Sequence, residues 1–245
     1  MWLKACLNGN RQTGVPTRPQ DLAADAVAVR EAGANAVHVH PRDGNGQESL
    51  DAADLAATVE AIRAAAPGLP IGVSTGLWIT GGDVRERLEA VRTWGALPAG
   101  SRPDFASCNV SEDGFRDLAL AVEDAGIAVE AGVWSPADAD ALAASGIADR
   151  TLRILVEIID APADTAADQA AQVLARLDDL GLTVPRLLHG EGTATWPLID
   201  EAIRLGLPTR IGLEDVLHDP DGRPVTTNAD LVRLALARSP APGAG

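Results

Sequence analysis

Short apolar runs alternate with longer amphipathic stretches along the whole chain. The apolar runs are as long as buried strands and lie at 3–8, 36–40, 71–75, 104–109, 127–132, 152–158, 185–189 and 209–215. The amphipathic stretches predict helices at 19–32, 51–65, 82–94, 112–125, 136–145, 164–180, 196–205 and 227–238. Eight strand–helix units in strict alternation favour a parallel sheet closed into a barrel. We therefore expect one α/β domain, a single (β/α)8 TIM barrel over residues 1–238, followed by a loose Pro/Ala/Gly-rich tail over 239–245.

Composition excludes several classes of partner. The net charge of −15 argues against nucleic acid and anionic membranes. No window approaches the roughly 20 apolar residues of a membrane span, and the first residues lack the apolar run of a signal peptide. We expect a soluble, cytoplasmic protein. Its two cysteines, Cys6 and Cys108, fall within predicted strands and should be buried thiols. Lys4 is the only lysine, so Schiff-base chemistry would depend on one residue early in the first strand.

Two histidines close the second apolar run. Side chains alternate across a strand, so His38 and His40 point the same way with Cα atoms roughly 6.5–7 Å apart. One metal ion can be reached by both. The alternative is that each is a hydrogen-bonded core residue, the commoner role of a histidine beside apolar neighbours. A third ligand would decide between the two readings.

Polar residues gather at the carboxyl ends of the predicted strands, where barrel enzymes carry their catalytic groups. They are Asn8, His38, His40, Ser74, Thr75, Ser107, Asn109, Glu130, Glu157, Asp160, His189, Glu191, Arg210, Glu214 and Asp215. Any one of them could simply cap the barrel mouth. Burying so many costs free energy unless they pair or hold a ligand, so the set as a whole indicates a site.

The eighth run offers the third ligand. Alternation places Arg210 and Glu214 on one face, and two histidines with one carboxylate form an open site for zinc or another divalent ion. Asp215 follows directly and could act as a general base held ionised by Arg210. Glu214 and Asp215 could also exchange roles, and the arginine–carboxylate pair could merely close the barrel.

These motifs resemble the β-keto acid cleavage enzyme family, which includes 3-keto-5-aminohexanoate cleavage enzyme. The resemblance rests on five segments that follow in order along the chain: 5–9 (Ala-Cys-Leu-Asn-Gly), 31–34, the His-x-His-x-Arg-Asp element at 38–43, Ser-Thr-Gly at 74–76, and Arg-x-Gly-x-Glu-Asp at 210–215, with Asn228 beyond them. The histidine and arginine elements are moderately specific alone and strong together.

The resemblance implies a zinc-dependent enzyme that converts a β-keto acid and acetyl-CoA into acetoacetate and a new acyl-CoA. It assigns the metal to His38, His40 and Glu214. It counts Asp215, Arg210 and Ser74 as catalytic, with Asp215 as the base. It places the substrate against Asn8, Arg11, Thr75, Gly76, Asn109 and Glu130. It also implies a homo-oligomer associated through outer helices, for which Trp78 and Trp94 are candidate interface residues.

Three departures from the family pattern affect what can be carried over. Arg11 stands where members acting on an amino acid have a glutamate, which suggests that the substrate carries a second anionic group. Glu130 suggests the opposite, because some members use a glutamate there to hold the amino group of the substrate. The loop at 160–163 after the sixth strand is short, which puts the thioester partner in doubt. His189 and Glu191 have no assigned role.

Two other functions compete with this reading. A class II aldolase for sugar phosphates would use similar ligands, but it needs a phosphate site where Glu191 stands. A divergent barrel that only binds a small carboxylic acid would explain the short loop but not the intact Arg210 and Asp215.

Overall fold

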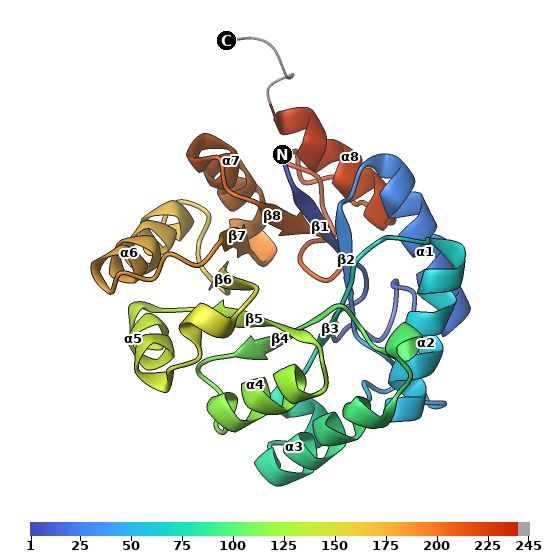
Figure 1. The fold of residues 1–245 in the computed structure, drawn as a ribbon. Coiled ribbons are helices and arrows are strands. Elements are labelled where there is room, and N and C mark those ends of the chain that lie inside the picture. The colour runs from blue at the N-terminus through green and yellow to red at the C-terminus, as the bar shows by residue number, and fades with distance from the viewer. Residues whose placement is uncertain (240–245) are drawn as a thin grey trace.

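The computed structural model describes residues 1–239 and shows a parallel barrel ringed by helices (Figure 1). The strands are β1 (Leu3–Cys6), β2 (Ala36–Val39), β3 (Ile71–Ser74), β4 (Phe105–Asn109), β5 (Ala128–Val133), β6 (Arg153–Ile158), β7 (Arg186–Gly190) and β8 (Thr209–Ile211). The helices are α1 (Pro19–Ala32), α2 (Ala52–Ala65), α3 (Val84–Thr93), α4 (Phe115–Asp124), α5 (Pro136–Ser145), α6 (Ala166–Asp179), α7 (Thr195–Leu205) and α8 (Asn228–Arg238). The predicted (β/α)8 barrel is confirmed. The predicted tail, beyond Ser239, lies outside the described residues.

The barrel is built from strands in sequence order, with β1 pairing both β2 and β8. Between β7 and β8 the contact is carried by the Leu188 amide, which donates to the Pro208 carbonyl at 3.0 Å, and by the Thr209 hydroxyl, which donates to the Leu188 carbonyl at 2.7 Å. The apolar strand residues are buried against helix faces such as Leu55, Val59 and Ile62 of α2. Burial on both faces explains why the strands read as continuous apolar runs.

The eighth strand ends at Ile211 and is therefore shorter than the predicted strand over 209–215. The chain leaves the strand at Gly212, where an added Cβ would stand 1.8 Å from the Cys6 carbonyl oxygen of β1. The chain then turns, and the amides of Asp215 and Val216 donate to the Gly212 carbonyl at 2.9 and 3.0 Å. Glu214 and Asp215 therefore reach the barrel mouth on a turn. The prediction that strand alternation puts Arg210 and Glu214 on one face does not apply to them.

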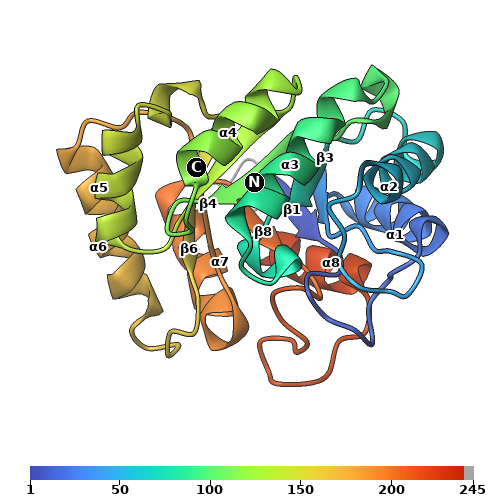
Figure 2. The same cartoon turned by 90° about the horizontal axis from the view of Figure 1, so that it is seen from below.

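All the carboxyl ends of the strands open at one face of the barrel. In Figure 2 the loops that follow β1 and β8 project from the same end of the molecule. Within residues 1–239, no helix is both long and apolar enough to cross a membrane. Cys6 and Cys108 are buried free thiols, as predicted, and burial raises the pKa of Cys108 to about 12.

Candidate active site

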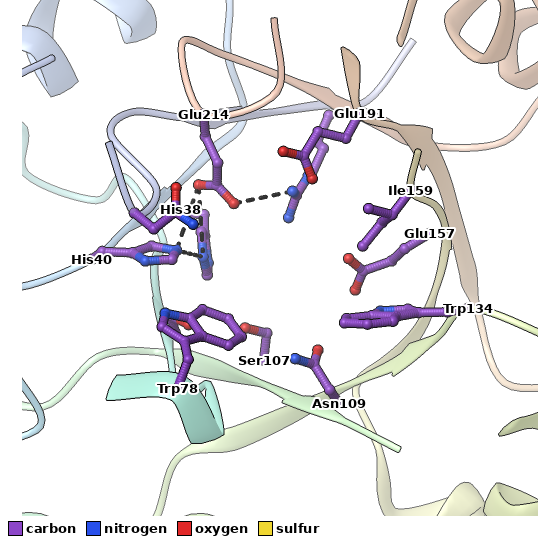
Figure 3. Close-up of a pocket in the computed structure, with 13 residues that line it drawn as sticks. His38, His40, Trp78, Ser107, Asn109, Trp134, Glu157, Ile159, Glu191 and Glu214 are labelled. Carbon is purple, nitrogen blue, oxygen red and sulfur yellow. Dashed lines mark hydrogen bonds and ion pairs between the residues drawn. The ribbon is translucent and has the colours of Figure 1, made fainter. Parts of the chain in front are cut away.

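A cavity of about 220 Å³ opens at the carboxyl ends of the strands (Figure 3). Its lining residues are Asn10, His38, His40, Ser74, Trp78, Ser107, Asn109, Trp134, Glu157, Ile159, Glu191, Arg210 and Glu214. Figure 3 shows the two histidines and Glu214 at one side and Glu157, Ile159 and Trp134 at the other. The cavity therefore has a histidine end, with His38, His40 and Glu214, and a distal end.

His38, His40 and Glu214 form a compact cluster at the first end. The two Nε2 atoms lie 3.2 Å apart, and the Glu214 Oε2 atom lies 4.0 Å from His38 Nε2 and 3.7 Å from His40 Nε2. Zinc binds nitrogen and oxygen at about 2.0–2.2 Å, so its ligand atoms stand roughly 3.3–3.5 Å apart around one tetrahedral ion. Three ligand atoms at these spacings can share a single divalent ion.

The chemistry of the three side chains also fits a metal. Glu214 Oε2 is buried without a hydrogen-bond partner and faces both histidines. Burial lowers the pKa of His38 well below its ordinary value despite the nearby Glu214 carboxylate, which keeps its imidazole neutral and able to coordinate. Burial lowers the pKa of His40, but the Glu214 and Glu48 carboxylates outweigh it and raise that pKa to about 9, so a bound metal ion would replace the proton of this imidazole.

Glu48 supports the cluster from behind, and the sequence reading missed it. Its Oε1 atom lies 2.5 Å from His40 Nδ1, and its Oε2 atom accepts a 3.0 Å hydrogen bond from the Trp78 indole. A carboxylate on the far nitrogen of a histidine ligand fixes the ring and its tautomer. Asn8 holds the same residue by its backbone, because its side-chain amide accepts from the His40 amide and donates to the His40 carbonyl, both at 2.9 Å. Asn8 therefore orients His40 and does not line the cavity.

Close packing brings Glu214 to the histidines. Gly9 has a φ of 55°, and an added Cβ there would stand 2.5 Å from Glu214 Cγ. Only glycine accommodates both this backbone and this contact at low cost. The Asn-Gly at the end of the first predicted strand thus makes room for the Glu214 side chain.

Arg210 joins Glu214, the predicted third metal ligand, to Asp215, the predicted base. Its Nη2 atom donates to Glu214 Oε1 at 3.0 Å and to Asp215 Oδ1 at 2.7 Å, and its Nε atom donates to the same Asp215 oxygen at 3.1 Å. Burial raises the pKa of Asp215 to about 7, against the lowering effect of Arg210. Asp215 Oδ2 has no hydrogen-bond partner, so it keeps a free lone pair. Asp215 is fully buried beside Arg210 and is not among the residues that line the cavity, whereas Arg210 is.

The Ser-Thr-Gly segment contributes one side chain to the cavity. Ser74 lines it, and its hydroxyl accepts from the Gly76 amide at 3.3 Å. Thr75 instead donates its hydroxyl to the Ser107 carbonyl at 2.6 Å. At Gly76 an added Cβ would lie 2.2 Å from the Trp78 ring. Thr75 and Gly76 therefore shape the wall and do not present side chains to a ligand.

Two predicted substrate-binding residues are engaged elsewhere. Arg11 donates from Nε to the Leu213 carbonyl at 2.6 Å and from Nη2 to the Glu214 carbonyl at 3.3 Å, outside the cavity lining. Glu130 is fully buried, with Oε2 2.6 Å from Lys4 Nζ and Oε1 3.1 Å from Arg153 Nε. Neither side chain lines the cavity, because backbone carbonyls hold Arg11 and two cations hold Glu130 inside the barrel. Lys4 is held away from the cavity by the same pair.

Only one of the residues at the distal end had a predicted role. Asn109 was predicted there, and its Nδ2 atom donates to Glu112 at 2.9 Å. Glu157, Trp134 and Glu191 complete this end. These residues stand at or just beyond the ends of β5, β6 and β7, and this position was the only sign in the sequence that they belong to the site. Position alone does not show which way a side chain points.

His189 lies behind Glu157 and does not line the cavity. Its Nε2 atom is 3.2 Å from Glu157 Oε2, in an orientation poor for a hydrogen bond. Burial, together with nearby Arg210, lowers the pKa of His189 to about 4.

Acidification is expected to destabilise the fold through His189. An unfolded histidine protonates near pH 6.5, so between about pH 6.5 and 4 the unfolded chain binds a proton that the folded chain does not. Its contribution to stability is complete above about pH 6.5 and is lost as the pH falls toward 4, on the order of 1–3 kcal/mol. Urea unfolding across this range should show a shallower pH dependence for His189→Gln than for the parent protein. Identical slopes would contradict this assignment.

The two tryptophans named as candidate interface residues differ in exposure, since Trp78 is 45% exposed and Trp94 is buried. Trp94 is fully buried and donates its indole N–H to the Leu50 carbonyl at 2.9 Å. Trp78 lines the cavity and stacks on the His40 ring, with centroids 6.3 Å apart. Trp94 is therefore a core residue, and Trp78 forms part of the site.

Solved structures share this fold. The chain matches ObcA in a ternary complex with C4-CoA adduct and oxalate at 20% identity, with a TM-score of 0.74, covering 91% of this chain and 63% of ObcA. It matches the binary complex of ObcA with oxaloacetate at 20% identity and a TM-score of 0.72, with the same coverage. A 3-dehydroquinate dehydratase from Geobacillus kaustophilus matches at 14% identity and a TM-score of 0.59, covering 96% of this chain and 90% of that one. The chain thus spans less than two thirds of the length of ObcA.

The family comparison agrees with the site. Residues 2–239 match the model of the beta-keto acid cleavage enzyme family, a span that includes the histidine pair, the Ser-Thr-Gly segment and the arginine–carboxylate turn. The chain belongs to the beta-keto acid cleavage enzyme family.

Proposed function

We propose that this protein is a zinc-dependent enzyme that converts a β-keto acid and acetyl-CoA into acetoacetate and a new acyl-CoA. The observation that carries the proposal is the cluster of His38, His40 and Glu214, linked through Arg210 to Asp215. The cluster can hold a divalent ion, and Asp215 supplies a basic oxygen without a partner. Neither a class II aldolase nor a barrel that only binds a small carboxylic acid requires all five of these side chains together.

The metal would polarise the ketone of the bound acid and stabilise the negative charge that develops when a C2 proton leaves. His38, His40 and Glu214 hold it in this proposal. Ser74, which lines the cavity close to the histidines, would orient the substrate carboxylate. Arg210 would keep Asp215 and Glu214 in place through its three hydrogen bonds.

The reaction proceeds by proton transfer and two carbon–carbon events. Asp215 accepts a proton from C2 of the keto acid, and the C2 carbanion attacks the acetyl thioester. The CoA sulfur leaves the acetyl carbon and adds to the former ketone carbon within the adduct. The bond between that carbon and C2 then breaks, releasing the new acyl-CoA, and C2 is reprotonated to give acetoacetate. This order needs a base and a cation at the keto acid, which the site provides.

The structural neighbours support a CoA thioester as co-substrate. ObcA has been solved with oxaloacetate, a keto acid, and with a C4-CoA adduct. The cavity has a volume of about 220 Å³, which is enough for a small organic acid. The rest of the CoA molecule would therefore lie outside the cavity, beyond the barrel mouth.

Metal analysis followed by an activity screen tests the proposal. Purified protein should contain about one zinc ion per chain, and a panel of β-keto acids with acetyl-CoA should yield acetoacetate in at least one case. Chelation should abolish that activity, and adding zinc should restore it. Full activity after chelation, or no acetoacetate across a broad panel with the zinc-loaded protein, would overturn the proposal.

A further inference from the structure

The loop that follows β1, residues 8–11, contacts two members of the cluster of histidines and carboxylate. Asn8 holds the backbone of His40 with two hydrogen bonds of 2.9 Å. Gly9 packs against the side chain of Glu214, where an added Cβ would stand 2.5 Å from Cγ. One short segment therefore lies against the backbone of a histidine and against the carboxylate side chain.

Arg11 holds the backbone on both sides of the Glu214 Cα atom. Its Nε atom donates to the Leu213 carbonyl at 2.6 Å, and its Nη2 atom donates to the Glu214 carbonyl at 3.3 Å. These carbonyls belong to the two peptide planes that flank the Glu214 Cα. A guanidinium presents its donors as a planar fork, so one side chain can fix both planes. The direction in which the Glu214 side chain leaves the backbone is therefore set by Arg11.

Asn228 restrains the same turn from the start of α8. Its buried Oδ1 atom accepts from the Leu213 amide at 2.7 Å, and its Nδ2 atom donates to the Leu7 carbonyl at 2.8 Å. Leu213 is thus held at its amide by Asn228 and at its carbonyl by Arg11. Through Leu7, Asn228 also ties the turn to the chain directly after β1.

Arg42, the arginine of the His-x-His-x-Arg-Asp element, holds the loop itself. Its Nη2 atom donates to the carbonyls of Gly9 and Arg11, the second at 3.1 Å. Arg42 is buried and stands two residues beyond His40. The segment that carries the histidines therefore also fixes the loop that fixes Glu214.

We propose that Arg11 is a positioning residue that, with Arg42 and Asn228, sets the distance between the Glu214 carboxylate and the two histidines. The inference rests on the proposed function only for the metal held by this cluster. It gives Arg11 a role inside the protein in place of the binding of a second anionic group. The positive charge of Arg11 opposes cation binding, so any affinity for metal that Arg11 adds must come from geometry.

Zinc affinity separates positioning from charge. Arg11→Met keeps the length of the side chain and removes both the donors and the charge. We expect this variant to bind zinc about 10- to 100-fold more weakly, the range for loss of a group that orients a metal ligand. If Arg11 acted through its charge alone, its loss would instead tighten zinc binding. Arg11→Lys keeps the charge without the planar fork and should recover only part of the loss.

A matched charge change and a stability measurement are the controls. Arg85→Met removes an exposed arginine of α3 and should leave zinc affinity unchanged. Unfolding of the metal-free proteins in urea shows whether the Arg11 variants are folded. A folded Arg11→Met protein with reduced stability but parental or tighter zinc binding would show a purely structural role and overturn the inference.

Crystal structures of the metal-free parent and of Arg11→Lys test the inference without zinc. In the parent, Glu214 Oε2 should lie 4.0 and 3.7 Å from the Nε2 atoms of His38 and His40, and in the variant it should lie farther from both. A variant turn over 213–215 in the parental position would overturn the inference. A parent protein that binds no zinc would instead contradict the proposed function, and this structural comparison would still decide the role of Arg11.

Discussion

The Asp215→Asn variant is expected to lose about 10²- to 10⁴-fold in turnover, the range that general-base catalysis contributes. The amide keeps the shape of the side chain and can still accept hydrogen bonds from Arg210 at Oδ1. What it lacks is a basic oxygen at the position of Oδ2, which has no other partner. Substrate affinity should therefore change much less than turnover.

Proton exchange at C2 isolates this step. The zinc-loaded parent protein should exchange the C2 protons of a bound β-keto acid with deuterium from solvent in the absence of acetyl-CoA, and Asp215→Asn should not. Unfolding in urea checks that the variant is folded. If Asp215→Asn exchanged C2 protons at the parental rate, Asp215 would be a structural partner of Arg210 and another group would be the base.

Loss of a metal ligand is the second change expected to have a large effect. His40→Ala and Glu214→Gln each remove a ligand from a cluster whose ligand atoms lie within 4.8 Å of one another. A site with two remaining protein ligands should not retain zinc through dialysis, and turnover should fall to background. Metal content and acetoacetate production are the two readouts. An active, metal-free Glu214→Gln protein would exclude this cluster as the catalytic centre.

Glu48→Gln should have a smaller effect on zinc binding than the loss of a ligand. Glu48 contacts His40 Nδ1 from outside the cluster, and outer carboxylates of this kind typically change metal affinity by about 10- to 100-fold. We expect weaker zinc binding, with activity recovered at high zinc concentration. Glu86→Gln, on the exposed side of α3, is a control that should change neither.

The sequence was sufficient to predict the barrel and the convergence of His38, His40 and Glu214. Period-two alternation placed His38 and His40 on one face, and the ends of parallel strands meet at one rim, so His40 and Glu214, 174 positions apart, could be predicted to converge. The Nε2 atoms of both histidines and the Glu214 carboxylate do converge. Glu214 reaches them on a turn that the alternation did not predict, since the chain leaves the strand at Gly212.

The substrate end was predicted less well because side-chain partners decide it. Glu130 and Arg11 occupy suitable positions in the sequence, yet Lys4 holds the first and backbone carbonyls hold the second. Nothing in the linear pattern shows that the only lysine is buried against Glu130. Glu48 was missed for the opposite reason, since it lies in a loop eight residues from His40 and its role appears only when the loop folds back.

Isotope labelling tests the central claim most directly. When the zinc-loaded protein reacts acetyl-CoA labelled with ¹³C in both acetyl carbons with an unlabelled β-keto acid, the label should appear in the ketone and methyl carbons of acetoacetate. The new acyl-CoA should carry none, because its acyl group comes from the keto acid. Label in the acyl-CoA, or acetoacetate without label, would contradict the reaction proposed for this site.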